Sequence, residues 1–171
     1  LMKARRINGS VSLLGAADWN RRLFDALIPL PDGTSYNAYL VRGSGKTALI
    51  DTADPSKSDI LLEQLADVSR VDYLVANHAE QDHSGTIPLV LDRYPGAVLL
   101  TTAKYKDMLV DLLSVSGDRI RTVADGETVS LGDKTLEFIH TPWVHWPETM
   151  CTYLQEDGIL FSGDFFGSHY A

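Results

Sequence analysis

The stretch VDYLVANHAEQDHSGTIPLVLDRYP, residues 71–95, joins two regular segments through a loop rich in acids and histidines. Residues 71–76 form an apolar run typical of a buried strand, and residues 84–95 carry apolar side chains at helical spacing. Loops at the carboxyl ends of strands open into the crevice where α/β proteins place their sites. We therefore expect an α/β fold with a functional site in this loop. Its candidate donors are His78, Glu80, Asp82 and His83.

Strand and helix signals alternate along the rest of the chain. Strand-like runs at 36–43 and 46–52 meet at Gly43-Ser44-Gly45, which predicts a hairpin. Apolar positions at helical spacing predict helices over 57–67 and 103–114. Short strands are predicted at 10–16, 97–102, 119–124, 127–131, 134–141, 150–155 and 158–164. Turn dipeptides at 125–126, 132–133 and 157–158 predict hairpins between the last of these strands.

Composition narrows the class of protein. The 171 residues suffice for one domain with a substantial core. A net charge of −8, without a basic cluster beyond residues 3–6 and Arg21-Arg22, argues against a nucleic-acid partner. The single cysteine, Cys151, excludes an internal disulfide and a thiolate metal cluster, and a reducing cytoplasm is the natural setting. No run approaches the 18 apolar residues that a membrane span needs, so we expect no membrane partner.

The loop at 78–83 has the spacing of a metal site. Side chains alternate along an extended chain, so His78, Glu80 and Asp82 can face the same way, and His83 can join them after the turn. The alternative is a solvated loop in which Asp82 or Ser84 caps the next helix. Acids and histidines clustered between a strand and a helix favour a metal site.

Two later positions repeat the pattern of a donor after a strand. His145 lies between Trp143 and Trp146 in a loop containing prolines, and a histidine packed against aromatic rings is the competing interpretation. Asp164 ends the apolar run 158–164, where a lone acid is more often a cap or a turn residue. Two such strand ends could point into one site.

The remaining candidates have structural interpretations beside functional ones. His140 ends a predicted strand, and we interpret it as a structural hydrogen-bonding residue. Trp143, Trp146 and Tyr105 either gate the pocket or pack in the core. The sequence assigns no role to His169.

Together these pieces resemble the metallo-β-lactamase superfamily, whose αββα sandwich carries H-x-H-x-D-H after a strand, then a later His, a bridging Asp and a final His. In HAEQDH, residues 78–83, Glu80 stands where most of that superfamily has histidine. That exchange, with the segments at 18–40, 145–150 and 160–170, is similar to the flavodiiron proteins specifically. The fold implied is a metallo-β-lactamase-like αββα sandwich, incomplete at the C-terminus.

The resemblance implies roles for named residues. His78, Glu80 and His145 would hold one iron and Asp82 and His83 the other, with Asp164 as the bridge. In that family the second histidine of the motif sometimes turns away from the metal, which concerns His83. Asp51 resembles the superfamily's structural Asp and would support the ligands, and Trp146 would lie near the FMN of the partner subunit. No catalytic residue separate from the ligands is expected.

The activity implied is that of a non-haem diiron oxidoreductase, which reduces dioxygen to water or nitric oxide to nitrous oxide. Electrons would come through FMN from a small protein such as rubredoxin, within a head-to-tail homodimer. Residues 1–171 would be the N-terminal part of the diiron domain, with the last histidine ligand and a flavodoxin-like FMN domain further downstream. A dizinc hydrolase of the same fold and a non-enzymatic oxygen-binding sensor are the alternatives, although a carboxylate at position 80 suits iron better than zinc.

Overall fold

Apolar residues fill both faces of the central parallel strands. The computed structural model describes residues 3–170 and places β6 (Thr47–Ile50), β7 (Tyr73–Val75) and β8 (Val98–Thr101) side by side. Because successive side chains of a strand point to opposite faces, these strands carry one apolar row on each face. The rows are Leu49, Leu74 and Leu99 on one face, and Ile50, Val75 and Leu100 on the other.

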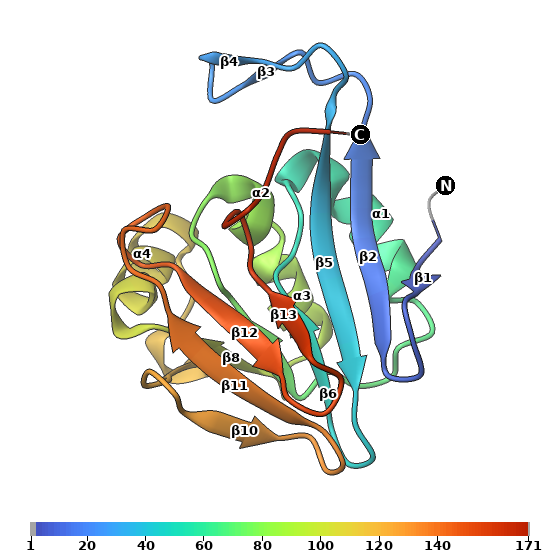
Figure 1. The fold of residues 1–171 in the computed structure, drawn as a ribbon, viewed down its shortest axis with the longest axis vertical. Helices are drawn as coiled ribbons and strands as arrows, with labels where there is room; N and C mark the ends of the chain where they lie inside the picture. Colours follow the sequence, from blue (N-terminus) through green and yellow to red (C-terminus); the bar gives the residue numbers. More distant parts are fainter. Residues whose placement is uncertain (1–2, 171) are drawn as a thin grey trace.

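These strands lie in a seven-stranded sheet of order β1-β2-β5-β6-β7-β8-β9 (Figure 1). The antiparallel pair of β5 and β6 is joined through residues 43–45, which confirms the predicted hairpin. Strands β6 to β9 are parallel, and α-helices connect them. The remaining strands are β1 (Arg5–Arg6), β2 (Val11–Asp18), β5 (Thr34–Arg42) and β9 (Ile120–Thr122).

A four-stranded antiparallel sheet packs on one face of the larger sheet. Phe138 and Met150 from this second sheet belong to the same buried cluster as the row through Val75. The predicted hairpins at 132–133 and 157–158 are confirmed. The one predicted at 125–126 is wrong, because β9 pairs with β8 and the turn carries the chain into the second sheet. The strands of this sheet are β10 (Thr128–Ser130), β11 (Thr135–His140), β12 (Met150–Leu154) and β13 (Ile159–Phe161).

Helices cover the other face of the larger sheet, and capping residues set their starts. Asp54 Oδ1 accepts a hydrogen bond from Ser56 N at 2.9 Å before α1, and Thr102 Oγ1 accepts one from Tyr105 N at 3.1 Å at the start of α4. The first helix is shorter than the predicted 57–67. The elements are η1 (Pro55–Lys57), α1 (Ser58–Gln64), α3 (Ile87–Arg93), α4 (Ala103–Leu113) and η2 (Gly117–Arg119).

A small hairpin, β3 (Leu23–Phe24) and β4 (Ile28–Pro29), was not predicted, and it projects beyond the N-terminal end of β5 (Figure 1). Its turn places Asp25 and Ala26 at φ of 49° and 55°, a conformation that Asn and Gly adopt more readily. The usual dipeptide signal is therefore missing from the sequence.

The layers are helices, a mixed sheet and an antiparallel sheet (Figure 1). Two buried apolar clusters lie between them. This is the α/β arrangement expected from the sequence. Within residues 3–170, helices cover one outer face of the two sheets. None of the helices in this range has the length and apolar character to span a bilayer.

Candidate metal centre

The root of the loop after β7 is fixed to the strands on either side. Asn77 N donates to Asp51 Oδ1 at 2.8 Å, directly after β6. Thr152 Oγ1 donates to Asn77 Oδ1 at 2.7 Å, and Met150 N donates to Asn77 O at 3.0 Å, both from β12. The loop is therefore clamped between the two sheets, at the carboxyl end of the parallel strands.

The second half of the motif is helical. Residues 81–84 form α2 (Gln81–Ser84), which Glu80 precedes with an extended ψ of 147°. The expected alternation along an extended chain therefore holds for His78 and Glu80 only, and Asp82 and His83 reach the site from a helical turn. The solvated-loop alternative is wrong, because all four candidate donors are at least nine-tenths buried and no side chain caps α2.

The folded chain brings six of the predicted donors into two adjoining groups, within which the ligand atoms lie within 4.8 Å of one another. One group joins His78 and Glu80 to His145, with His78 Nε2 at 3.1 Å from Glu80 Oε2 and His145 Nε2 at 3.7 Å from the same oxygen. The other joins Asp82 and His83, with His83 Nε2 at 3.6 Å from Asp82 Oδ2.

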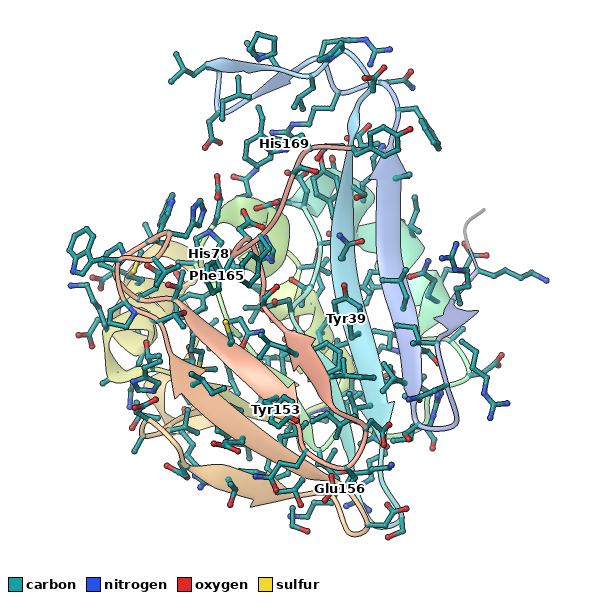
Figure 2. All side chains as sticks on the ribbon, viewed as in Figure 1. Tyr39, His78, Tyr153, Glu156, Phe165 and His169 are labelled. Carbon is teal, nitrogen blue, oxygen red and sulfur yellow. The ribbon has the colours of Figure 1, made fainter. Side chains whose placement is uncertain are left out.

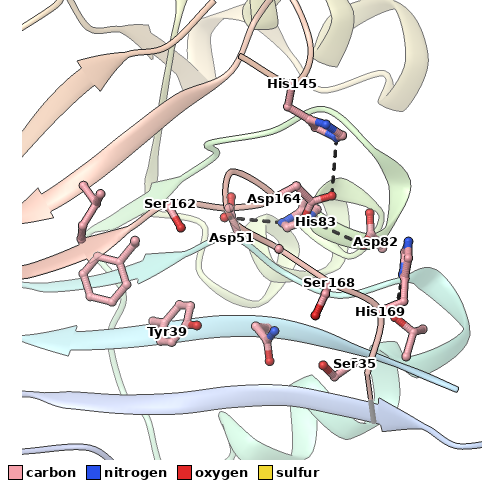
Figure 3. A pocket seen from close by; sticks show the side chains of 16 residues that line it. Ser35, Tyr39, Asp51, Asp82, His83, His145, Ser162, Asp164, Ser168 and His169 are labelled. Atoms are coloured by element: carbon pink, nitrogen blue, oxygen red, sulfur yellow. Dashed lines mark hydrogen bonds and ion pairs between the residues drawn. The ribbon is translucent and has the colours of Figure 1, made fainter. Parts of the chain in front are cut away.

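Asp164 belongs to both groups. Its Oδ1 lies 2.7 Å from His83 Nε2, and its Oδ2 lies 3.6 Å from His145 Nε2 (Figure 3). The two oxygens of one carboxylate thus face the two groups. One carboxylate could therefore contact a cation in each group.

The centre opens into a polar cavity of about 320 Å³. His169 lies at its far side, where Nδ1 is 3.1 Å from Thr34 Oγ1 (Figure 3). The ring of His169 packs on Phe24. The centre and the cavity lie toward one end of the molecule: Figure 2 shows His78 and His169 at that end and Glu156 at the opposite end. The cavity is lined by hydroxyl, amide and carboxylate side chains, which include Ser35, Asn37, Tyr39, Ser162 and Ser168.

The charges of the centre depend on one another. Burial alone would lower the pKa of His78, but hydrogen bonds to Glu148 and Glu80 outweigh it and raise the pKa to about 9. Burial, with repulsion from Asp164 and Glu80, raises the pKa of Asp82 to about 6. Burial opposes ionisation of Asp164 too, yet His83 lowers its pKa to about 2. Imidazolium charge thus balances crowded carboxylates here, and a metal cation would give the same balance.

An unsatisfied polar atom also fits a cation. Over residues 3–170, Asp82 Oδ1 is buried without a hydrogen-bond partner. Such an atom is costly unless something binds it. His83 Nδ1, on the other side of the ring from the nitrogen that faces Asp164, lies 3.6 Å from Asp51 Oδ2, so Asp51 can support the position of His83.

The aromatic candidates take different positions. Tyr105 is buried and its hydroxyl donates to the carbonyl of His78, so it belongs to the core and does not gate the pocket. Trp146 packs partly on the core, edge-on to His78 with ring centroids 5.1 Å apart. Trp143 is 77% exposed. His140 Nε2 lies 3.1 Å from the carbonyl of Val123, which confirms its structural role.

Sequence reasoning missed two acids at the centre. Glu148 is buried and contacts His78 Nδ1 at 2.9 Å. Asp25, in the unpredicted hairpin, has a raised pKa, first because of a hydrogen bond with Glu80. A single acid in a loop has no periodic signal. For Glu148, the available signal was its position three residues after the candidate donor His145.

Comparison with known proteins agrees with the fold. Residues 34–171 match the family model described as ODP family beta lactamase. A nitric oxide reductase of Moorella thermoacetica is 40% identical over 96% of this chain and 42% of its own length. Rubredoxin oxygen:oxidoreductase from Desulfovibrio gigas superposes with a TM-score of 0.93 at 34% identity, over 99% of this chain and 43% of that one.

The flavodiiron protein from Giardia intestinalis also superposes with a TM-score of 0.93, at 31% identity, over 100% of this chain and 42% of its own. The chain spans about two fifths of the length of the curated relatives it matches.

Proposed function

The chain belongs to the ODP family of β-lactamase-like proteins, and from this premise we propose that it is the N-terminal part of a diiron oxidoreductase. The proposed reaction is reduction of dioxygen to water, of nitric oxide to nitrous oxide, or of both. One observation carries the proposal: two groups of nitrogen and carboxylate donors meet at the two oxygens of Asp164. The names of the nitric oxide reductase and the oxygen oxidoreductase that resemble this chain support it.

We assign His78, Glu80 and His145 to one iron, and Asp82 and His83 to the other. Asp164 is shared between them. The closeness of the donor atoms within each group supports this assignment, and His83 turns Nε2 toward Asp82 and Asp164. That orientation favours His83 as a ligand.

The donor chemistry favours iron over zinc. Carboxylates are hard, anionic donors, and this centre has three of them beside three imidazoles. Zinc sites prefer four tetrahedral ligands, whereas non-haem iron accepts mixed nitrogen and oxygen ligands with open positions. When bound, two irons supply the redox equivalents and open coordination positions that reduction of a diatomic gas needs.

The side chains around the irons have separate tasks. Asp51 restrains His83 from the side away from the proposed metal, and Asn77 ties the loop to both sheets. The polar cavity beside Asp164 gives small diatomic substrates and product water a route to the centre. His169 and Thr34 place exchangeable protons along that cavity, which reduction of either gas consumes.

We propose that FMN on a flavodoxin-like domain downstream of residue 171 supplies the electrons, within a head-to-tail homodimer. A small redox protein such as rubredoxin would reduce the flavin. Trp146 lies edge-on to His78, and the neighbouring Trp143 is exposed, which supports electron entry at this surface. A buried, unpaired Cys151 supports a reducing cytoplasm as the location.

Metal analysis and turnover of the full-length protein, purified anaerobically from its native source, test the proposal. We expect two irons per chain, a coupled ferric spectrum after oxidation, and consumption of oxygen or nitric oxide driven by a reduced flavin. Two zincs without iron, with hydrolysis of a thioester, lactone or phosphodiester, would overturn it in favour of a hydrolase. A stable oxygen adduct without turnover would overturn it in favour of a sensor.

A further inference from the structure

Glu148 is a buried carboxylate that the proposed ligand set does not include. It comes from the loop between β11 and β12, and its side chain is fully buried. Its Oε1 accepts two hydrogen bonds, from His78 Nδ1 at 2.9 Å and from Ala79 N at 2.9 Å. A buried carboxylate is costly unless it is paired, so this placement requires a reason.

The backbone around this contact is itself anchored. Thr102 Oγ1, at the start of α4, donates to the carbonyl of Glu148 at 3.1 Å and accepts from Tyr105 N. The hydroxyl of Tyr105 donates to the carbonyl of His78. Both the backbone and the ring of His78 are therefore positioned from the N-terminal turn of one helix.

Only one ring nitrogen of His78, Nε2, faces the proposed metal. Nδ1 faces Glu148, and Nε2 lies 3.1 Å from Glu80 Oε2, inside the donor group that includes His145. A ligating histidine needs a lone pair on the nitrogen that faces the metal, and a hydrogen bond from the other nitrogen selects that tautomer.

We propose that Glu148 is the positioning residue of His78. It accepts the Nδ1 proton, fixes the tautomer with the lone pair on Nε2, and holds the ring toward Glu80 and His145. The inference rests on the proposed diiron function, because it requires a cation at Nε2.

A purely structural role does not explain why a charged carboxylate occupies position 148. A neutral glutamine would accept the same two hydrogen bonds, so joining the two loops requires no charge. The second oxygen, Oε2, is buried without a partner in the described part of the chain. A full negative charge beside the ring increases the basicity of the imidazole, which strengthens its bond to a cation.

Three variants of the full-length protein test the role: Glu148→Leu, Glu148→Gln and, as the control, Asp72→Asn. Asp72 Oδ2 accepts from Thr47 N at 2.8 Å, at the opposite end of β7 from His78. Affinity for Fe²⁺ is measured by chelator competition. The Nδ1 proton of His78 is followed by NMR in protein with ¹⁵N-labelled histidine, loaded with Zn²⁺ as a diamagnetic probe.

We expect Glu148→Leu to weaken the affinity for one of the two ions about 10- to 100-fold, since that is the usual cost of losing such a partner. Its Nδ1 proton signal should disappear. Glu148→Gln should retain the signal at higher field, with a smaller loss of affinity, because the amide oxygen still accepts the proton. Asp72→Asn should lower stability and leave both readouts unchanged.

Wild-type affinity for both ions in Glu148→Leu, or an equal loss in Asp72→Asn, would overturn the inference. If Glu148→Leu does not fold, Glu148→Gln decides, because an unchanged affinity and an unchanged proton signal would overturn it too. A wild-type protein that binds no pair of Fe²⁺ ions would overturn the proposed function together with this inference. Normal wild-type binding with unaffected variants would overturn the inference alone.

Discussion

Nε2 of His83 lies 2.7 Å from Oδ1 of Asp164, although the two residues are 81 positions apart in the chain. His83 comes from α2, beside the larger sheet, and Asp164 follows the last strand of the second sheet. The contact therefore forms only when the two sheets have packed together. The centre is a product of the whole fold, and neither half of the described chain contains it.

Replacing the shared carboxylate should disrupt both groups of donors. Asp164→Asn retains the shape of the side chain and removes the charge that faces His83 and His145. We expect iron bound after anaerobic reconstitution to fall from two per chain to less than one, with an unchanged circular dichroism spectrum. Asp111→Asn, on the exposed side of α4, is the control. Retention of two irons by the Asp164 variant would show that Asp164 does not bridge them.

Acid should remove the ionic contribution that Asp54 makes to stability. Burial would raise the pKa of Asp54, but hydrogen bonds from Ser56 and the charge of Arg21, 3.1 Å away, outweigh it and lower the pKa below 3.8. A carboxylate with a lowered pKa in the folded state stabilises the fold above its unfolded pKa. That contribution is lost as the pH falls through the folded value.

The corresponding variant is Asp54→Asn, which can still cap η1. At pH 7 its free energy of unfolding should be lower than that of the wild type by on the order of 1 kcal/mol. The difference should shrink as the pH falls below 3.8. Urea denaturation of both proteins at each pH measures it, and a difference that stays constant down to pH ~3 would contradict the assignment.

Much of the fold was predictable because its signals are local. The apolar run at 71–76 predicted a buried strand, and in the structure Leu74 and Val75 are buried on its opposite faces. The hairpin through residues 43–45 has the usual glycines. The candidate donor positions followed from acids and histidines placed after predicted strands. The αββα resemblance supplied their grouping.

The rest depended on contacts that no local pattern encodes. The turn at Asp125-Gly126 resembles a hairpin, and only the pairing of β9 with β8 sends the chain into the other sheet. The four-residue helix at 81–84 is too short for a periodic signal. Glu148 acquires its role from a residue 70 positions earlier.

The end of α4 offers a test of backbone conformation. Ser114 follows the helix with φ of 53° and ψ of 30°, the left-handed region in which glycine is favoured. Ser114→Gly should raise the free energy of unfolding by roughly 0.5–1 kcal/mol, as measured by urea denaturation. Ser116 has φ of −63°, so Ser116→Gly should lower it. Equal effects of the two substitutions would contradict the assigned strain.

The proposed preference for iron over zinc depends on Glu80. Its Oε2 lies 3.1 Å from His78 Nε2 and 3.7 Å from His145 Nε2, so a substitution there changes the donor set directly. Glu80→His replaces a hard anionic donor by a neutral imidazole, which suits zinc better. In full-length protein reconstituted with equal Fe²⁺ and Zn²⁺, we expect the bound metal to shift toward zinc. Reduction of oxygen or nitric oxide should fall by more than about 100-fold, since loss of an outer partner alone costs 10- to 100-fold.

Gln81→His is the matched control, because it adds an imidazole at the neighbouring exposed position and leaves the donors unchanged. Wild-type metal preference and turnover in Glu80→His would remove Glu80 from the ligand set.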